Sequence, residues 1–210
     1  MDKDLFIEKT KELGINLTNK QLEDLEKYYN LLISWNEKIN LTRIVEKEDV
    51  YLKHFYDSLT LIKVIDLNKD LTLCDIGTGA GFPGLVLKIC FPNLKITLVD
   101  SLQKIIYFLN EVIKELDLKD IKAIHSRAED IKDTYDVVTS RAVANLNLLS
   151  KYCLPLVKKG GYFIPMKANV DEEIKEATNT IHKLGGKLEK QETFNLPIEG
   201  SIRNLLVIRK

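Results

Sequence analysis

The sequence has few cysteines, and those that it has form no pattern. Its 210 residues include only Cys74, Cys90 and Cys153, which are far apart and lie in apolar surroundings. Isolated cysteines of this kind are typical of core residues in a protein of the reducing cytoplasm. We therefore exclude a disulfide-stabilised scaffold and a cysteine metal site, and we expect a cytoplasmic protein without a bound metal.

Long hydrophobic runs and an excess of one charge are also missing. No apolar run approaches the ~20 residues of a membrane span, and the first residues lack the pattern of a signal peptide. The 31 basic residues are balanced by 31 acidic ones. Bulk charge therefore does not indicate a nucleic-acid partner, so any contact with RNA has to come from a local basic patch. We expect no membrane partner, and a monomer as the default oligomeric state.

One stretch, residues 71–84, organises the rest of the chain. The apolar run 71–76 is short and ends in glycine, which predicts a buried strand. The apolar residues after Pro83 predict a helix that packs on a sheet, and proline suits the first turn of a helix. Alternating glycines between the two allow a tight turn and the close approach of a ligand. We expect backbone N–H groups of this loop to point at that ligand.

Two cofactor classes use such a loop. From Gly79 to Gly84 it matches the G-x-G-x-x-G fingerprint of dinucleotide-binding proteins, with Asp100 at a suitable distance for a ribose. From Asp75 it has the acid-x-Gly-x-Gly-x-Gly pattern of S-adenosylmethionine methyltransferases. Because the strand is expected to end at residue 76, Gly77 is the first glycine of the turn. This register favours the methyltransferase interpretation, while the dinucleotide interpretation stays open.

The periodicity of apolar residues predicts an α/β fold. Helices are expected at 3–13, 18–39, 47–65, 104–116, 144–157 and 170–184, and strands at 71–76, 94–99, 121–124, 135–139, 162–166, 187–194 and 204–209. This alternation indicates a mainly parallel sheet with helices on both faces and an antiparallel pair of closing strands. We divide the chain into an N-terminal helical extension, 1–60, packed on the core, and a domain formed by 61–210.

Two features of the extension have a plain and a functional interpretation. The aromatic stripe that includes Tyr28, Tyr29 and Trp35 follows helical spacing, which favours a core face over a platform for stacking bases. His54 and Asp57 are three residues apart and can share a helix face. We expect them to form a hydrogen-bonded pair that fixes helix packing rather than part of a site.

Polar residues follow the predicted strands at their carboxyl ends, where doubly wound sheets bind ligands. A carboxylate at Asp100 can accept both hydroxyls of a ribose. Glu129, or the backbone next to Ala128, is placed to bind the edge of an adenine. Arg141 is suited to a carboxylate, a phosphate or a base edge. Among the basic residues at the rim, we single out Lys167 and Arg203 as contacts for RNA.

Several blocks of the sequence together resemble one family, the glucose-inhibited division protein B family. In chain order they are Trp35-Asn36, Asn40-Leu41-Thr42, Lys53 to Leu59, Asp75 to Gly84, Leu98 to Ser101, Ser126 to Glu129 and Ser140-Arg141-Ala142. The resemblance extends over nearly the whole chain. The chain departs from the family pattern at three positions, which are Ile105, Val143 and Ala168.

The resemblance implies a class I (Rossmann-like) S-adenosylmethionine-dependent methyltransferase with an N-terminal helical extension. The family methylates guanine N7 in 16S ribosomal RNA of the bacterial small subunit. By the same resemblance, the residues that contact S-adenosylmethionine are Gly77, Phe82, Ala128, Glu129 and Arg141. Asp100 joins them on the strand-end argument. The implied partner is ribosomal RNA or the small ribosomal subunit.

The implied chemistry needs no catalytic acid or base. Guanine N7 already has a free lone pair, so catalysis can depend on holding it in line with the methyl group. The sequence has no Asn/Asp-Pro-Pro-aromatic block and no Pro-Cys pair, which other nucleic-acid methyltransferases use. Three alternatives remain: a nucleotide-dependent oxidoreductase, a methyltransferase for a small molecule, and an RNA-binding module without activity.

Overall fold

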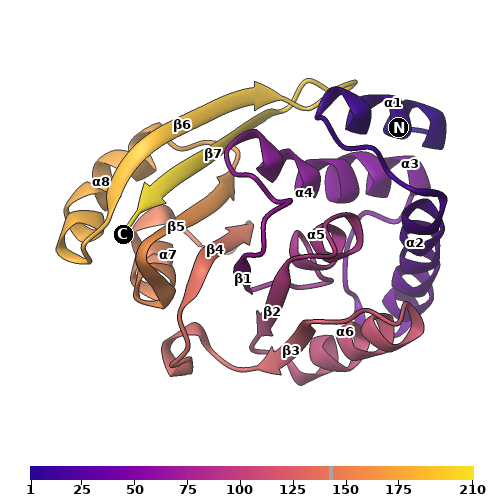
Figure 1. Cartoon of the computed structure of the whole chain (residues 1–210), viewed down its shortest axis with the longest axis horizontal. Helices are drawn as coiled ribbons and strands as arrows, with labels where there is room; N and C mark the ends of the chain where they lie inside the picture. Colours follow the sequence, from indigo (N-terminus) through magenta and orange to yellow (C-terminus); the bar gives the residue numbers. More distant parts are fainter. Residues whose placement is uncertain (142–143) are drawn as a thin grey trace.

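A seven-stranded sheet forms the centre of the molecule (Figure 1). The computed structural model describes residues 1–141 and 144–210, so Ala142 and Val143 of the sequence blocks lie outside it. The strands follow the order β3-β2-β1-β4-β5-β7-β6. Their bounds are β1 Thr72–Ile76, β2 Lys95–Asp100, β3 Ile121–His125, β4 Tyr135–Arg141, β5 Val157–Lys167, β6 Lys187–Asn195 and β7 Ile202–Arg209.

The directions of the strands confirm the predicted sheet. Strands β1 to β5 pair in parallel, whereas β7 is antiparallel to both β5 and β6. Strand order reverses between β1 and β4, which are neighbours although β2 and β3 come between them in the chain. Ligands of doubly wound sheets bind beyond the carboxyl ends of the strands at such a point. The fold therefore directs attention to the residues that follow β1 and β4.

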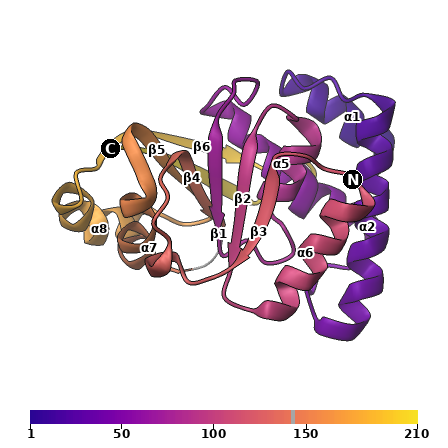
Figure 2. The same ribbon diagram turned by 60° about the horizontal axis from the view of Figure 1, so that its bottom comes forward.

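Helices cover both faces of the sheet, as expected (Figure 2). On one side lie α2, α5 and α6, whose bounds are Asn19–Ile39, Gly84–Cys90 and Gln103–Glu115. On the other side lie α7 and α8, at Leu146–Cys153 and Asp171–Lys183. Each side has its own cluster of buried apolar residues. All three cysteines are buried, which confirms their interpretation as core residues.

The N-terminal part packs into the core on the side of α5 and α6. It comprises α1 (Lys3–Glu12), α2 and a helical segment that runs from 47 to 63 as α3 (Lys47–Val50), η1 (Tyr51–Tyr56), α4 (Asp57–Leu59) and η2 (Thr60–Lys63). Helix α2 starts with a capping box, since Thr18 and Gln21 each accept a hydrogen bond from the backbone N–H of the other. No helix of the described residues is long and apolar enough to cross a membrane.

The aromatic stripe of α2 belongs to the core, as predicted. Tyr28 is fully buried, and its ring lies 5.5 Å from that of Phe55 and 5.6 Å from that of Phe82 in the glycine loop. Its hydroxyl donates a hydrogen bond to the backbone carbonyl of Ala80 in the same loop. Trp35 packs on Phe108 of α6. Helix α2 of the N-terminal part therefore packs directly against the glycine loop.

Strand β5 differs from the prediction because it starts five residues earlier. A turn was expected over 158–161, but the strand runs from Val157 through these residues. The register against β4 shifts between Tyr135 and Val137, so the extra residues form an irregularity in a continuous strand. Gly160, at φ +82°, donates its N–H to the carbonyl of Lys210. Pairing with the C-terminus thus holds a glycine-rich turn within the sheet.

Candidate functional site

A cavity of about 430 Å³ opens at the carboxyl ends of β1, β2 and β3. Four of the predicted cofactor residues line it, namely Gly77, Asp100, Ala128 and Glu129. Gly77 follows β1, Asp100 ends β2, and the other two belong to η3 (Ala128–Asp130), the turn after β3. The parallel strands thus bring together residues that are up to 52 positions apart in the sequence. Ser101, Arg127 and Tyr152 are among the other residues that line this cavity, which we call the loop cavity.

Asp100 is held in place by the backbone. One carboxylate oxygen accepts from the N–H of Gly79 and the other from the N–H of Leu102, both at 3.0 Å. A carboxylate offers about four acceptor positions, so each oxygen keeps the capacity for one more donor. The carboxylate of Asp100 is thereby fixed with free acceptor capacity beside the loop cavity. This arrangement is suited to the two hydroxyls of a ribose.

The glycine loop itself corrects one expectation. We expected its backbone N–H groups to point at a ligand, but most of them already donate to acceptors of the protein. Those of Gly77 and Thr78 bond the carbonyl of Val99, and those of Gly81 and Phe82 bond the carbonyl of Thr78. Gly79 donates to Asp100, and Gly84 donates to Asp75 at 2.8 Å. A pyrophosphate would find little to bind here, which argues against the dinucleotide interpretation.

Two carboxylates lie under the loop instead. Asp75 is fully buried; its Oδ2 accepts from Thr78 and Gly84, while Oδ1 has no partner among the described residues. The pKa of Asp75 is raised to about 7: burial, with a smaller contribution from the charge of Asp100, outweighs the hydrogen bonds from Thr78 and Gly84 and the charge of Arg141. A positive charge placed nearby would stabilise both carboxylates. The loop therefore suits a cationic cofactor better than an anionic one.

Phe82 and Arg141, the remaining predicted cofactor residues, do not line the loop cavity. Phe82 is buried, and its ring stacks on that of His54 with 4.2 Å between centroids. The guanidinium of Arg141 lies 5.3 Å from the centroid of the same ring. Phe82 thus connects the glycine loop to a cluster around Arg141. A direct contact of either residue with a cofactor stays a prediction.

A second cavity, of about 480 Å³, lies beside Arg141 at the ends of β4 and β5. We call it the basic cavity, because its lining includes Lys53, Arg141, Lys167 and Arg203. Lys167 is only 9% exposed, donates to the carbonyl of Ala144 and pairs with Glu173 at 2.8 Å. Arg203 pairs with Asp57. The two residues predicted to contact RNA are therefore neighbours, but each is also anchored within the protein.

His54 and Asp57 are bonded to Arg141 rather than to each other. His54 faces Arg141 Nη2 with Nδ1 at 2.9 Å, and Asp57 faces Nη1 at 3.2 Å. Because the guanidinium donates to Nδ1, the other ring nitrogen of His54 carries the proton and donates to Thr42. Burial and the charge of Arg141 lower the pKa of His54 to about 3. The prediction that His54 and Asp57 bond each other was wrong, because both side chains accept hydrogen bonds from Arg141 instead.

Comparison with known proteins identifies the family. A family model described as rRNA small subunit methyltransferase G (GidB) matches residues 21–203. Ribosomal RNA small subunit methyltransferase G of Bacillus velezensis is 52% identical over 212 residues, which cover 98% of this chain and 89% of the relative. The protein of that name from Bacillus thuringiensis is 50% identical over 217 residues, covering 100% and 91%. The chain belongs to this family.

Solved structures agree with the fold of the methyltransferase G family. A SAM-dependent methyltransferase from Aquifex aeolicus superposes with a TM-score of 0.58 and 18% identity, over 85% of this chain and 98% of that one. TYW2 of M. jannaschii, solved in complex with AdoMet, gives a TM-score of 0.54 at 18% identity, over 67% and 68%. At this identity the likeness concerns the fold alone. The class I methyltransferase fold predicted from the sequence is confirmed.

The structure adds residues to the site that the sequence did not reveal. Tyr152 belongs to α7, on the face of the sheet away from α2, α5 and α6, and it lines the loop cavity. Lys53, His54 and Asp57 come from the N-terminal part and reach the basic cavity. In the sequence these residues belong to the Lys53 to Leu59 block. This block is typical of the methyltransferase G family, but it does not indicate which residues its side chains contact. Only the fold shows that this block faces Arg141.

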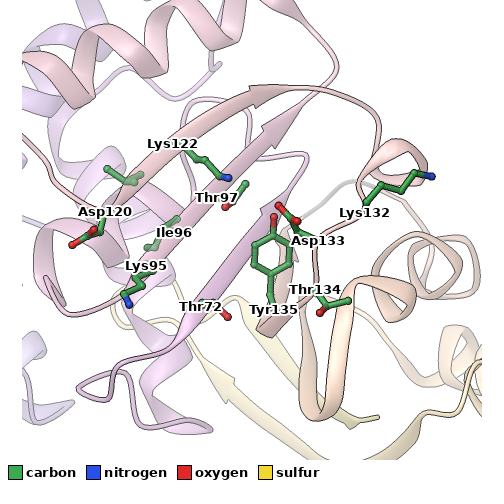
Figure 3. Close-up of a pocket in the computed structure, with 11 residues that line it drawn as sticks. Thr72, Lys95, Ile96, Thr97, Asp120, Lys122, Lys132, Asp133, Thr134 and Tyr135 are labelled. Atoms are coloured by element: carbon green, nitrogen blue, oxygen red, sulfur yellow. The ribbon is translucent and has the colours of Figure 1, made fainter.

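A further cavity, of about 720 Å³, lies at the opposite ends of the strands (Figure 3). It is lined by Lys95 and Thr97 of β2, Lys122 of β3 and Tyr135 of β4, with Lys132 at its rim. The connection from β3 to β4 holds only the short turn η3, so no long helix covers the sheet there. None of the predicted site residues of this methyltransferase G family member lines it. Size alone therefore does not mark the candidate site.

Proposed function

We propose that this protein transfers a methyl group from S-adenosylmethionine to N7 of a guanine in 16S ribosomal RNA of the small ribosomal subunit. The observation that carries the proposal is the match to the methyltransferase G family over residues 21–203. The loop cavity and the basic cavity beside it support it, because one suits a cationic cofactor and the other a negatively charged nucleic acid. The cytoplasm, where ribosomal RNA is found, is the proposed place of action.

The residues of the loop cavity fit the proposed cofactor. Asp100 lines the cavity, and Asp75 lies buried beneath the loop outside its lining; both carboxylates would favour a cofactor that carries positive charge. Asp100 would hold the ribose, and Ala128 and Glu129 would border the adenine. Gly77 lines the same cavity and adds no side chain to its wall. Phe82 and Arg141 would close the site on the side of the basic cavity.

The proposed reaction requires positioning rather than proton transfer. When bound, the cofactor would supply a methyl group on a sulfonium: the lone pair of guanine N7 would form a bond to the methyl carbon while the C–S bond breaks in line, and the sulfur would leave as a neutral thioether. No proton leaves the base, so the protein needs no general base. His54, the titratable group with the most suitable chemistry, is kept neutral by burial and by the charge of Arg141, which lower its pKa, and it donates to Thr42. What remains for the protein is to hold the guanine in line, an effect worth up to about 7–11 kcal/mol.

The proposal is tested by mapping methylated guanines in ribosomal RNA from cells with and without this protein. We expect one N7-methylguanine in 16S RNA to disappear when the protein is absent. In a parallel assay, labelled cofactor is offered with assembled small subunits, naked 16S RNA and an unrelated RNA of equal length. Equal labelling of all three, or labelling of a small molecule alone, would contradict the proposal.

The buried carboxylate of Asp75 predicts that cofactor binding releases protons. At pH 7 this group is about half protonated, given its pKa of about 7. A cation bound beside it favours the charged form and lowers the pKa, so protons leave on binding. Calorimetric titration of the cofactor at pH 7, in buffers of different ionisation enthalpy, measures the number released. We expect up to about half a proton for the wild type and none from this site in Asp75→Asn.

The same group gives a pH dependence of stability without cofactor. The folded protein binds the proton of Asp75 up to about pH 7, whereas the unfolded chain releases it near pH 4. Between these values the folded state binds more protons, so this contribution to stability falls as pH rises through the window and is constant above it. Urea unfolding of wild type and Asp75→Asn at pH 5, 6 and 8 measures it. If the free energy of unfolding falls no more steeply with pH in the wild type than in Asp75→Asn, the assigned pKa is contradicted.

A further inference from the structure

A single buried carboxylate connects three distant parts of the chain beside the basic cavity. Asp57, from α4, is 3% exposed. Its Oδ2 accepts from Arg141 Nη1 at 3.2 Å, and its Oδ1 accepts from Arg203 Nε at 3.1 Å. Arg141 is the last residue of β4, and Arg203 is the second residue of β7. The two arginines are 62 positions apart in the sequence. Among the residues that the structure describes, Asp57 is the group that both guanidinium groups share.

Both arginines keep donors that the protein does not use. Arg141 donates Nη1 to Asp57 and to the carbonyl of Lys53, and Nη2 to His54. Arg203 donates Nε to Asp57 and Nη1 to Ser201 and to the carbonyl of Ile202. Arg141 Nε and Arg203 Nη2 have no acceptor within 1–141 and 144–210. Both side chains line the basic cavity, so these donors are available to a ligand there.

Two guanidinium groups face the single carboxylate of Asp57, and His54 adds no charge because it is neutral. Lys167 pairs with Glu173, whereas Lys53 pairs with two carboxylates, Asp49 and Glu199, so these charged groups together are neutral. What a phosphodiester group of RNA would bind here is therefore the unused N–H donors of the two guanidinium groups, not an excess of charge. Arginine binds such a group through two parallel N–H donors, provided that its plane is fixed.

We propose that Asp57 is a positioning residue that fixes Arg141 and Arg203 as a two-arginine clamp for a phosphate next to the target guanine. The proposal rests on the proposed function for the identity of the RNA. Asp57 itself does not touch the substrate. It holds two long side chains, which would otherwise repel each other and turn toward solvent, in one arrangement beside the basic cavity. Binding of RNA then does not have to order them.

The test compares Asp57→Asn and Asp57→Glu with the wild type, and with Asp24→Asn as a matched control. Asp24 is also a buried carboxylate of the N-terminal part, 6% exposed and paired with Lys20 at 2.5 Å, but it does not line either cavity. We expect kcat/KM with small subunits to fall about 100-fold in Asp57→Asn, mainly through KM. Cofactor affinity, measured by calorimetry, should fall much less than kcat/KM, because only Arg141 of the two arginines borders the proposed cofactor site, and Asp57→Glu should recover part of the loss.

A merely structural role predicts a different result. In that case Asp57→Asn would weaken cofactor affinity and RNA affinity alike, in step with a lower melting temperature, and this outcome would overturn the proposal. A double variant sharpens the test: if Asp57 acts through Arg203, adding Asp57→Asn to Arg203→Ala should cost much less than it does in the wild type. Fully additive losses would also overturn it.

Failure of the proposed function gives a separate signature. If the wild type methylates no ribosomal RNA, that function is wrong whatever Asp57 does. The affinity of small subunits for wild type and Asp57→Asn, measured by co-sedimentation at two salt concentrations, then decides the role of Asp57. Equal affinity at both concentrations would reject the clamp. A lower affinity of the variant, with a smaller salt dependence, would support it.

Discussion

Gly77→Val is expected to lower affinity for S-adenosylmethionine by about 100-fold, which corresponds to about 2.7 kcal/mol. Gly77 lines the loop cavity at the end of β1 and has φ +66°. A valine there places three extra carbon atoms at the cavity wall. Its β-branched side chain is also strained at positive φ, so the loop has to move or the cavity has to fill. Calorimetric titration of the cofactor measures the loss.

Gly160→Val is the control variant for the backbone strain that valine causes at positive φ. Gly160 has a similar positive φ of +82°, and a Cβ there meets no atom within 4 Å. It lies in the irregular part of β5, at the ends of the strands away from the loop cavity. We expect both variants to lose comparable stability and only Gly77→Val to lose the cofactor. Retained affinity in Gly77→Val would refute the placement of the cofactor at this loop.

The sequence predicted the architecture well because its signals are local. Glycines after the apolar run 71–76 mark the end of β1, and the spacing of apolar residues separates strands from helices over most of the chain. The capping box at Thr18 marks the start of α2. Such features depend on neighbours in the sequence, so one sequence is sufficient. Strand β5 was misjudged because Gly160 and Gly161 have the local signal of a turn, whereas the C-terminus pairs with them.

The site was predicted in part, and the missing part is long-range. Residues that end strands, such as Asp100, were found because parallel strands bring their ends to one edge. The contacts of Asp57 were not found, because its partners Arg141 and Arg203 come from β4 and β7, which are distant in the sequence. Helical spacing within one segment suggested His54 as its partner instead. The loop N–H groups were misjudged for the same reason, since Val99 and Asp100 are the acceptors of three of them.

Gly84→Ala is expected to destabilise the folded protein by about 3 kcal/mol. An added Cβ would lie 2.2 Å from Leu98 Cδ2 and 2.9 Å from Asp75 Oδ2. Both neighbours are fully buried, and Asp75 Oδ2 accepts the N–H of Gly84 itself. Neither can withdraw without leaving a cavity or a broken hydrogen bond. The usual gain of up to about 1 kcal/mol for alanine over glycine in a helix is therefore reversed. Urea unfolding measures the change.

Gly79→Ala separates crowding from backbone strain within the same loop. Gly79 has φ +55°, but a Cβ there meets no atom within 4 Å, so alanine costs only the strain of about 1–2 kcal/mol. If Gly84→Ala proves milder than Gly79→Ala, the close approach of α5 to the sheet does not matter. The expected order has a functional consequence, because a shift of α5 withdraws the N–H of Gly84 from the carboxylate of Asp75 in β1. Loss of this hydrogen bond raises the pKa of Asp75 further, so Gly84→Ala should increase the proton release that accompanies cofactor binding at pH 7.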